Sequence, residues 1–315
     1  MLAPLVVLGV FSAAAWLLYN EVRAVDAADV AGALAGLPRW RIGLAVLALL
    51  ANYAVLGLYD TLGVQYLRRK VPLRRTALAG MLGFAFSTGL GHAVLTGGGV
   101  RYRLYTSWGV SVEDVARLIV FVGVAFWVGF LLLGGLVFTL APPEAAGALG
   151  FSPRVLGLGL LALLAGYFGL AASGRGPLRL GRFSLYAPRL PLALTQATVA
   201  ATDLFLAGLI LWLLIPVPVA FPLVLGTYLL ALIAGAVSQV PGGLGVFDGV
   251  IVLVLGELLP LDVLLGSLLA FRLLYYLIPL VVASAVFAGT EVNRVRRGSR
   301  LAALRRTRAQ RRQAA

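Results

Sequence analysis

Cysteine is absent from the 315 residues, and histidine and lysine occur once each, as His92 and Lys70. Without thiols there is no disulfide, zinc–thiolate site or iron–sulfur cluster, and one histidine does not assemble a multi-histidine metal site. The lysine lies in an Arg-Arg-Lys-Val run, so the Gly-Lys-Ser/Thr phosphate loop is missing, as are the HExxH and GxSxG motifs. We therefore expect no cofactor, no metal site and no enzymatic activity.

Charged residues are also scarce, at 12% of the chain against 61% hydrophobic residues. The mean hydropathy is +0.99, far above the range of soluble domains. Apolar runs of roughly 18 to 25 residues recur along the chain, which is the length that a helix needs to cross a hydrocarbon layer about 30 Å thick. The composition predicts an all-α integral membrane protein without a soluble domain.

The net charge of +14 comes mostly from three segments, which hold 18 of the 26 basic residues. Arginine and lysine are retained on the cytoplasmic side of membrane proteins, so this clustering indicates topology and not nucleic-acid binding. The three segments are Arg68 to Arg75, which also follows Asp60; Arg175 to Arg189; and the tail 291–315 with nine arginines. The nearly neutral or acidic segments 20–40, 141–154, 216–219 and 259–262 fit the opposite side.

Eight apolar units can be recognised, and two of them are interrupted by glycine. Unit three is interrupted at Gly97-Gly98-Gly99 and unit seven at Pro241 to Gly245. Glycine runs and proline favour the end of a helix, and backbone groups freed at membrane depth must face protein or a cavity. We interpret both units as re-entrant hairpins. The units are 2–19, a retained first helix and not a cleaved signal peptide; 41–59; 77–110; 113–140; 155–172; 192–215; 220–258; and 263–288.

The charge pattern then predicts an inverted repeat. If each hairpin returns to the side it came from, six spanning helices connect all the loops on consistent sides, with both chain termini in the cytoplasm. The first repeat is 1–140, with hairpin 77–110, and the second is 141–290, with hairpin 220–258. Inverted repeats with discontinuous helices are the architecture of many secondary transporters.

Several ionisable residues are predicted at membrane depth, where an isolated arginine or aspartate is disfavoured by about 2.5 to 3.5 kcal/mol. They are His92, Arg101, Arg103, Asp203, Asp248, Glu257 and Arg272. Pseudo-symmetry would bring Arg101 and Arg103 towards Asp248, where an ion pair between the repeats could form. Asp203 and His92 are candidates for proton or ion coupling, and a structural hydrogen bond is the alternative for each.

The candidate substrate site combines arginines with backbone N–H groups, which together suit a lipid phosphate. Asp248 would compete for the arginines or bind the cationic part of a headgroup. The alternative is that these residues only lock the hairpins together. The candidate residues are Gly98, Gly99, Arg101, Arg103, Gly242, Gly243, Asp248, Arg272 and Tyr275.

Three stretches carry a resemblance to a known family: Gly97 to Arg101 (GGGVR), Pro241 to Asp248 (PGGLGVFD) and Arg272 to Pro279 (RLLYYLIP). The chain resembles the transmembrane, flippase-like half of lysylphosphatidylglycerol synthases and the stand-alone membrane proteins related to it. The family usually has glutamate where this chain has Asp248, a change that shortens the reach and keeps the charge. Its synthase activity resides in an additional soluble domain, and the present sequence ends after the basic tail.

The resemblance implies a lipid translocase of a bacterial inner membrane, which moves a phospholipid or lipid-linked headgroup, anionic by preference, between leaflets. One alternative is a proton-coupled secondary transporter of a small anion, in which Asp203 or Asp248 carries the proton. A second alternative is an intramembrane partner of a lipid-modifying enzyme. A homo-oligomer or a separate synthase would be the protein partner.

Overall fold

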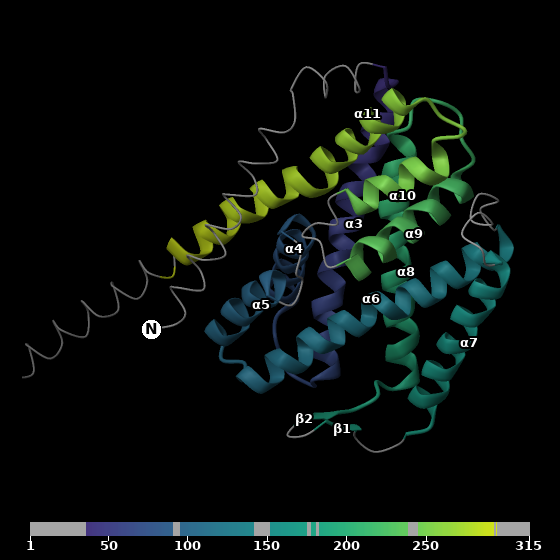
Figure 1. Ribbon diagram of the computed structural model, residues 1–315. Helices are drawn as coiled ribbons and strands as arrows, with labels where there is room; N and C mark the ends of the chain where they lie inside the picture. The colour runs from purple at the N-terminus through teal and green to yellow at the C-terminus, as the bar shows by residue number, and fades with distance from the viewer. Residues whose placement is uncertain are drawn as a thin grey trace, which may run out of the picture.

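The computed structural model describes residues 36–90, 95–141, 152–174, 178–180, 183–238, 245–292 and residue 294, and these are almost entirely helical (Figure 1). In chain order the elements are α3 (Arg39–Tyr66), α4 (Leu73–Leu90), α5 (Thr96–Ser107), α6 (Val112–Leu140), α7 (Pro153–Ala172), β1 (Leu178–Leu180), β2 (Phe183–Leu185), α8 (Leu190–Leu213), α9 (Phe221–Ser238), α10 (Val246–Leu255), α11 (Leu261–Phe271) and the π-helix η3 (Arg272–Leu277). Helical residues continue beyond η3, so that α11, η3 and this extension form one long helix, Leu261–Val292.

Six of the described helices are long and apolar enough to cross a membrane: α3, α6, α7, α8, α9 and the long helix that begins with α11. Five of them match predicted spanning units. The sixth is α9, which we predicted to be one arm of a hairpin and not a spanning helix. The predicted first span, 2–19, lies outside the described residues. Large apolar side chains on the outer faces are exposed, among them Leu47, Val155 and Leu163, as a lipid-facing surface requires. The prediction of an all-α membrane protein is confirmed at this level.

Helices α3 and α8 pack against each other in opposite directions. Near the start of α3, Arg41 donates from Nη1 to the carbonyl oxygen of Ile215, just after α8, at 2.5 Å. At the end of α3, the hydroxyl of Tyr66 donates to the carbonyl oxygen of Tyr186, just before α8, at 2.8 Å. These two bonds fix which ends of the two helices lie together.

The two interrupted units each form a pair of packed helices, α4 with α5 and α9 with α10. Figure 1 shows the two pairs on either side of α3. The break predicted in unit seven is confirmed, because α9 ends at Ser238 and α10 begins at Val246. Gly245, which precedes α10, has a φ of 75°, a backbone conformation that glycine adopts without steric cost.

The break predicted at Gly97-Gly98-Gly99 was placed wrongly. The three glycines lie inside α5, and the interruption falls earlier, between Leu90 and Thr96. A Cβ added to Gly97 would overlap the carbonyl oxygen of Gly83 and the hydroxyl of Ser87, both on α4. Gly97 is therefore needed for the close approach of α5 to α4, and none of the three glycines ends a helix.

The ends of the first hairpin lie together. Arg69, in the connection that leads into α4, pairs with Asp114 at the start of α6, with an N–O distance of 2.7 Å. Because α6 directly follows α5, the α4–α5 pair begins and ends at one end of the bundle. The bond between Tyr66 and Tyr186 brings the connection before α8 to that same end.

Helix α9 begins at the opposite end of the bundle. There the indole N–H of Trp212, near the end of α8, donates to the carbonyl oxygen of Val219, just before α9, at 2.7 Å. In Figure 1 the start of α11 is drawn close to the start of α3, and α11 packs against α8.

A small antiparallel pair of strands departs from the prediction of an all-α chain. Strand β1 pairs with β2, with Leu178 opposite Leu185 and Leu180 opposite Phe183. Both strands lie in the basic segment 175–189. The alternation Leu-Arg-Leu has the period of two that suits a strand, a signal too short to be noticed between two long helices.

Each hairpin packs into its own hydrophobic core. The core around α4 and α5 includes Phe86 and Tyr105 and draws on the end of α3 and the start of α6. The core around α9 and α10 includes Tyr228 and Phe247 and draws on the end of α8 and on Phe271 of α11. Neither hairpin depends on the other for its main packing.

Candidate functional site

Arg101, in the second turn of α5, forms a buried ion pair with Asp60 of α3. Its Nε lies 3.1 and 2.9 Å from the two carboxylate oxygens, and its Nη2 lies 2.8 Å from Oδ2. The side chains are 4% and 0% exposed. Gly83 of α4 leaves room for the guanidinium, since a Cβ there would lie 2.7 Å from Arg101 Cζ. Arg101 is thus compensated in charge and closed off from solvent.

Asp60 was predicted to lie in the polar segment after unit two, and this was wrong. Helix α3 continues to Tyr66, so Asp60 lies within the helix and is fully buried. The drop in hydropathy at Tyr59-Asp60 therefore corresponds to a buried polar site and not to the end of the helix. Asp60 can be buried there because Arg101 compensates its charge.

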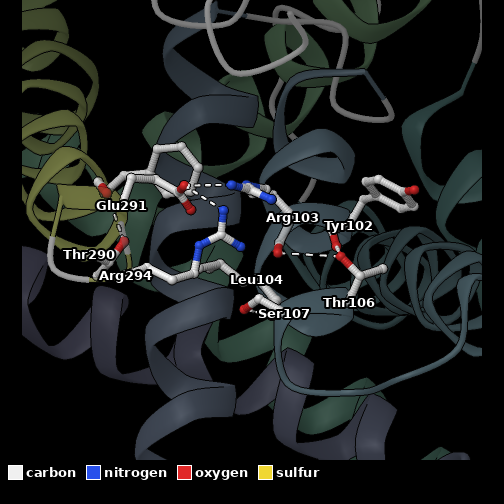
Figure 2. A network of polar contacts seen from close by, with 9 residues as sticks. Tyr102, Arg103, Leu104, Thr106, Ser107, Thr290, Glu291 and Arg294 are labelled. Atoms are coloured by element: carbon white, nitrogen blue, oxygen red, sulfur yellow. Dashed lines mark hydrogen bonds and ion pairs between the residues drawn. The ribbon is translucent and has the colours of Figure 1, made fainter. Parts of the chain in front are cut away.

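Arg103 points away from Arg101, because two residues correspond to about 200° around an α-helix. Its Nη2 lies 2.7 Å from Oε2 of Glu291, near the end of the long helix, and Nη2 of Arg294 lies 2.9 Å from the same oxygen. Figure 2 shows the carboxylate between the two guanidinium groups. This network ties α5 to the end of the long helix.

Asp248, in the first turn of α10, pairs with Arg272 at the start of η3. Arg272 donates from Nε to Oδ1 at 3.2 Å and from Nη2 to Oδ2. The backbone N–H of Gly245 also donates to Oδ2, at 3.2 Å. The Arg272 and Asp248 side chains are 21% and 22% exposed. This ion pair is thus more accessible than the one between Arg101 and Asp60.

The predicted ion pair between the repeats does not form. Arg101 and Arg103 pair with Asp60 and Glu291, and Asp248 pairs with Arg272. Each hairpin packs into a separate core, so the first charged residue of its second arm meets a partner on a helix of that core.

Arg272 and Tyr275 both lie in the π-helix η3, a distortion that often occurs at functional sites. Tyr275 is 6% exposed, and its ring stacks on that of Phe271 with a centroid distance of 5.0 Å. The ring of Tyr276 meets it edge-on at 5.4 Å. Tyr275 therefore belongs to the packed wall behind Arg272, and contact with a substrate stays a prediction.

Asp203 lies in α8 and is bound by two side chains of α3. The amide Nδ2 of Asn52 donates to Oδ1 at 2.7 Å and to the backbone carbonyl oxygen of Asp203 at 2.9 Å. The hydroxyl of Tyr59 donates to Oδ2 at 2.8 Å. Asp203 is 4% exposed, Asn52 0% and Tyr59 1%. In the described part of the chain, no arginine or lysine forms an ion pair with Asp203.

The remaining predicted site residues contribute less to this geometry. Gly98 is buried in the first turn of α5, and the N–H of Gly99 donates to the carbonyl oxygen of Leu95 at 3.0 Å, so it is not free for a phosphate. His92, Gly242 and Gly243 lie outside the described residues. Where the structure is described, no group of three His, Cys, Asp or Glu side chains could hold a metal ion.

Sequence reasoning missed Asn52, Tyr59 and Asp60 as partners of the buried charges. Their spacing carried a signal, because positions i, i+7 and i+8 share one face of a helix. A single asparagine in an apolar run, followed at that distance by Tyr-Asp, indicates a polar stripe that faces other helices. The partner of each residue could not be read from the same pattern.

Comparisons with known proteins identify relatives along most of the chain, although no family model matches it. The chain is 37% identical over 279 residues to slr0712 of Synechocystis sp., an uncharacterized protein, with 86% of each chain covered. It is 32% identical over 245 residues to the inner membrane protein YbhN of Escherichia coli, with 76% of each chain covered.

A third relative is much longer than this chain. Phosphatidylglycerol lysyltransferase of Staphylococcus haemolyticus is 27% identical over 274 residues, a match that covers 84% of this chain and 31% of that protein. The chain thus spans about a third of the lysyltransferase. With six candidate spans, it is a multi-pass protein of the bacterial inner membrane, and it belongs to the family that includes slr0712, YbhN and the membrane region of the lysylphosphatidylglycerol synthases.

Proposed function

We propose that the chain is a flippase-like translocase that moves the headgroup of an anionic phospholipid between leaflets, and that it is a transporter and not an enzyme. The observation that carries the proposal is that both hairpins have a charged residue near the start of the second arm, paired with a residue of a long helix. These are Arg101 with Asp60 and Asp248 with Arg272. Ionisable residues at membrane depth are costly and are commonly retained for function, and the Asp248–Arg272 pair is the one of the two that is accessible to a substrate.

Two short arms support a re-entrant geometry. Helix α5 has 12 residues and α10 has 10, so at 1.5 Å per residue they extend about 18 and 15 Å, short of a 30 Å layer. The α4–α5 pair begins and ends where Arg69 meets Asp114, and α9 begins at the other end of the bundle. We infer an inverted repeat of 1–140 and 141–290, whose hairpins enter from opposite faces.

We infer the orientation in the membrane from the basic connections. Arg68 to Arg75 and the segment before α8 lie at one end of the bundle, joined by the bond between Tyr66 and Tyr186. This end faces the cytoplasm if the positive-inside rule holds, and both chain termini are then cytoplasmic. The first hairpin would enter from the cytoplasm and the second from the periplasm.

Arg272 is the residue best suited to bind a lipid phosphate. Its ion pair with Asp248 is about one-fifth exposed, and a guanidinium can exchange a carboxylate for a phosphate with similar two-point geometry. Arg101 is enclosed by Asp60 and α4, so we assign it to locking the first hairpin. The relatives named phosphatidylglycerol lysyltransferase suggest phosphatidylglycerol as the first lipid to test.

The test is leaflet exchange of labelled phosphatidylglycerol in liposomes that contain the purified protein. The variant Arg272→Ala should slow exchange by roughly tenfold to a hundredfold, because charge-assisted hydrogen bonds contribute about 1.5 to 3 kcal/mol. The control is Arg154→Ala, because Arg154 is exposed in the first turn of α7 and forms no ion pair within the described ranges. The Arg154→Ala variant should exchange lipid at the rate of the wild type.

Three results would contradict the proposal. If lipid exchange is equally fast in vesicles with wild-type protein and in empty vesicles, the protein is not a translocase. If Arg272→Ala and Arg154→Ala exchange lipid at equal rates, Arg272 does not bind the substrate. If soluble glycerol phosphate enters the vesicles while lipid does not exchange, the protein is instead a transporter of small anions.

A further inference from the structure

The carboxyl group of Asp203 joins the two halves of the molecule. It lies on α8, in the second half, and both side chains that bind it, Asn52 and Tyr59, lie on α3 in the first half. At one end of the same pair of helices Arg41 contacts Ile215, and at the other Tyr66 contacts Tyr186. Asp203 lies between these two contacts, in the interior of the bundle.

No basic side chain in the described structure neutralises Asp203. Arg101 of α5 is paired with Asp60, which follows Tyr59 on α3, Arg41 of α3 donates to the carbonyl oxygen of Ile215, and Arg272 is paired with Asp248. An ionised carboxylate in such surroundings is costly without a cation. The site therefore suits the binding of one positive charge.

The groups that face Asp203 from the neighbouring helices are phenols. Those that interact with it electrostatically are Tyr53 and Tyr59 of α3, Tyr228 of α9 and Tyr275 of η3. The charged residues of α6 and α7, which also pack against α8, lie in the first two turns of those helices and are Glu113, Asp114, Arg117 and Arg154. Asp203 thus lies near four phenol side chains, of which Tyr59 is in hydrogen-bond contact with it.

The geometry favours a proton over a metal cation. A metal ion needs several converging oxygen ligands, and the described residues hold no cluster of three acidic or metal-binding side chains. A proton on Oδ2 needs no heavy atom to move, because the Tyr59 hydroxyl, 2.8 Å away, can turn from donor to acceptor. The Nδ2 amide group of Asn52 also donates to the backbone carbonyl oxygen of Asp203. The Oδ1 atom of Asn52 is a buried acceptor without a donor among the described atoms.

We propose that Asp203 binds and releases one proton in each transport cycle, and that this proton couples lipid movement to the transmembrane proton gradient. The proton adds to Oδ2 from water on one side of the membrane and leaves to water on the other. The ionised carboxylate accepts two charge-assisted hydrogen bonds from α3, which weaken when it is protonated. Protonation thus changes the contact between the two halves. The coupling rests on the proposed function, whereas the proton binding does not.

The proton site is tested without transport, by infrared titration of the purified protein in lipid nanodiscs. Wild-type protein should show a carboxylic-acid C=O band that disappears as the pH is raised, because burial favours the protonated form of the acid, and Asp203→Asn should lack this band. The control Asp262→Asn removes an exposed carboxylate in the first turn of α11 and should keep the band. Tyr59→Phe retains the ring and should shift the midpoint of the titration.

A band that persists in Asp203→Asn, or a midpoint unchanged in Tyr59→Phe, would overturn the proton site. Coupling is tested in liposomes with a pH-sensitive dye inside. A pH gradient should change the rate of phosphatidylglycerol exchange severalfold for the wild type and Asp262→Asn, and leave Asp203→Asn unaffected. Exchange that ignores the gradient overturns the coupling, whereas absence of any exchange overturns the proposed function and leaves the infrared result to decide the proton site.

Discussion

At the scale of residues, Asp60, Asp203 and Asp248 lie within the bundle, and each has different surroundings. Asp60 is fully buried against Arg101, Asp248 shares a partly exposed ion pair with Arg272, and Asp203 has only neutral donors in the described structure. Burial without a partner is costly for any of them. The exposure and charge of the partner therefore distinguish the proposed structural pair from the proposed substrate site and the proposed proton site.

The structural role of the first pair can be measured by reversible unfolding in mixed micelles. We expect Asp60→Ala to lower the free energy of unfolding by about 3 to 5 kcal/mol, because it leaves the Arg101 charge buried alone. The double variant Asp60→Leu with Arg101→Met should recover most of that loss and retain lipid exchange, since apolar residues of similar size replace a buried pair at little cost.

The exposed Asp262→Ala is the matched control for loss of a carboxylate and should change stability by less than about 0.5 kcal/mol. If the double variant unfolds as easily as Asp60→Ala, the pair is not the source of the loss. If it folds and no longer exchanges lipid, Arg101 acts on the substrate after all.

At the scale of elements, the glycines of the first hairpin have a packing role. Gly97 faces the backbone of Gly83 on α4 with no room for a Cβ. Close helix approach through small residues is a common source of stability in membranes, where apolar side chains gain little from leaving lipid. The α4–α5 pair therefore depends on this contact.

We expect Gly97→Ala to lower the free energy of unfolding by about 1 to 3 kcal/mol, the usual cost of an overpacked site. Gly123→Ala on α6 is the control, because nothing lies within 4 Å of a Cβ there and alanine should be neutral or stabilise the helix by up to about 1 kcal/mol. Equal changes in the unfolding of the two variants would contradict a packing role for Gly97.

Most of the helices could be predicted from hydropathy within a few residues of their bounds, for example 113–140 against α6 (Val112–Leu140), but unit two was predicted to end at 59 and α3 continues to Tyr66. The interruption in unit three could not be located, since glycine favours both helix ends and close packing. The partner of Arg101 could not be predicted either. It depends on which helix face meets α5, and Asp60 looked like the first residue of a loop.

At the scale of the whole molecule, the proposed transport uses two hairpins that enter from opposite faces. This is the arrangement of transporters with inverted repeats, in which discontinuous helices meet at a site near the middle of the bilayer. The described ends agree with opposite entry, through Arg69 with Asp114 at one end and Trp212 with Val219 at the other. Which end faces the cytoplasm follows only from the basic residues.

The most direct measurement is the labelling of single cysteines with a membrane-impermeant maleimide, in spheroplasts and in inverted vesicles. The chain has no cysteine of its own, and four exposed positions flank the hairpins: Arg74, Ser107, Ala220 and Glu257. We predict that Arg74→Cys and Ser107→Cys react only from the cytoplasmic side, and that Ala220→Cys and Glu257→Cys react only from the periplasmic side. Reaction of Arg74→Cys and Ser107→Cys from opposite sides would mean that the first hairpin crosses the membrane, and it would contradict the re-entrant architecture.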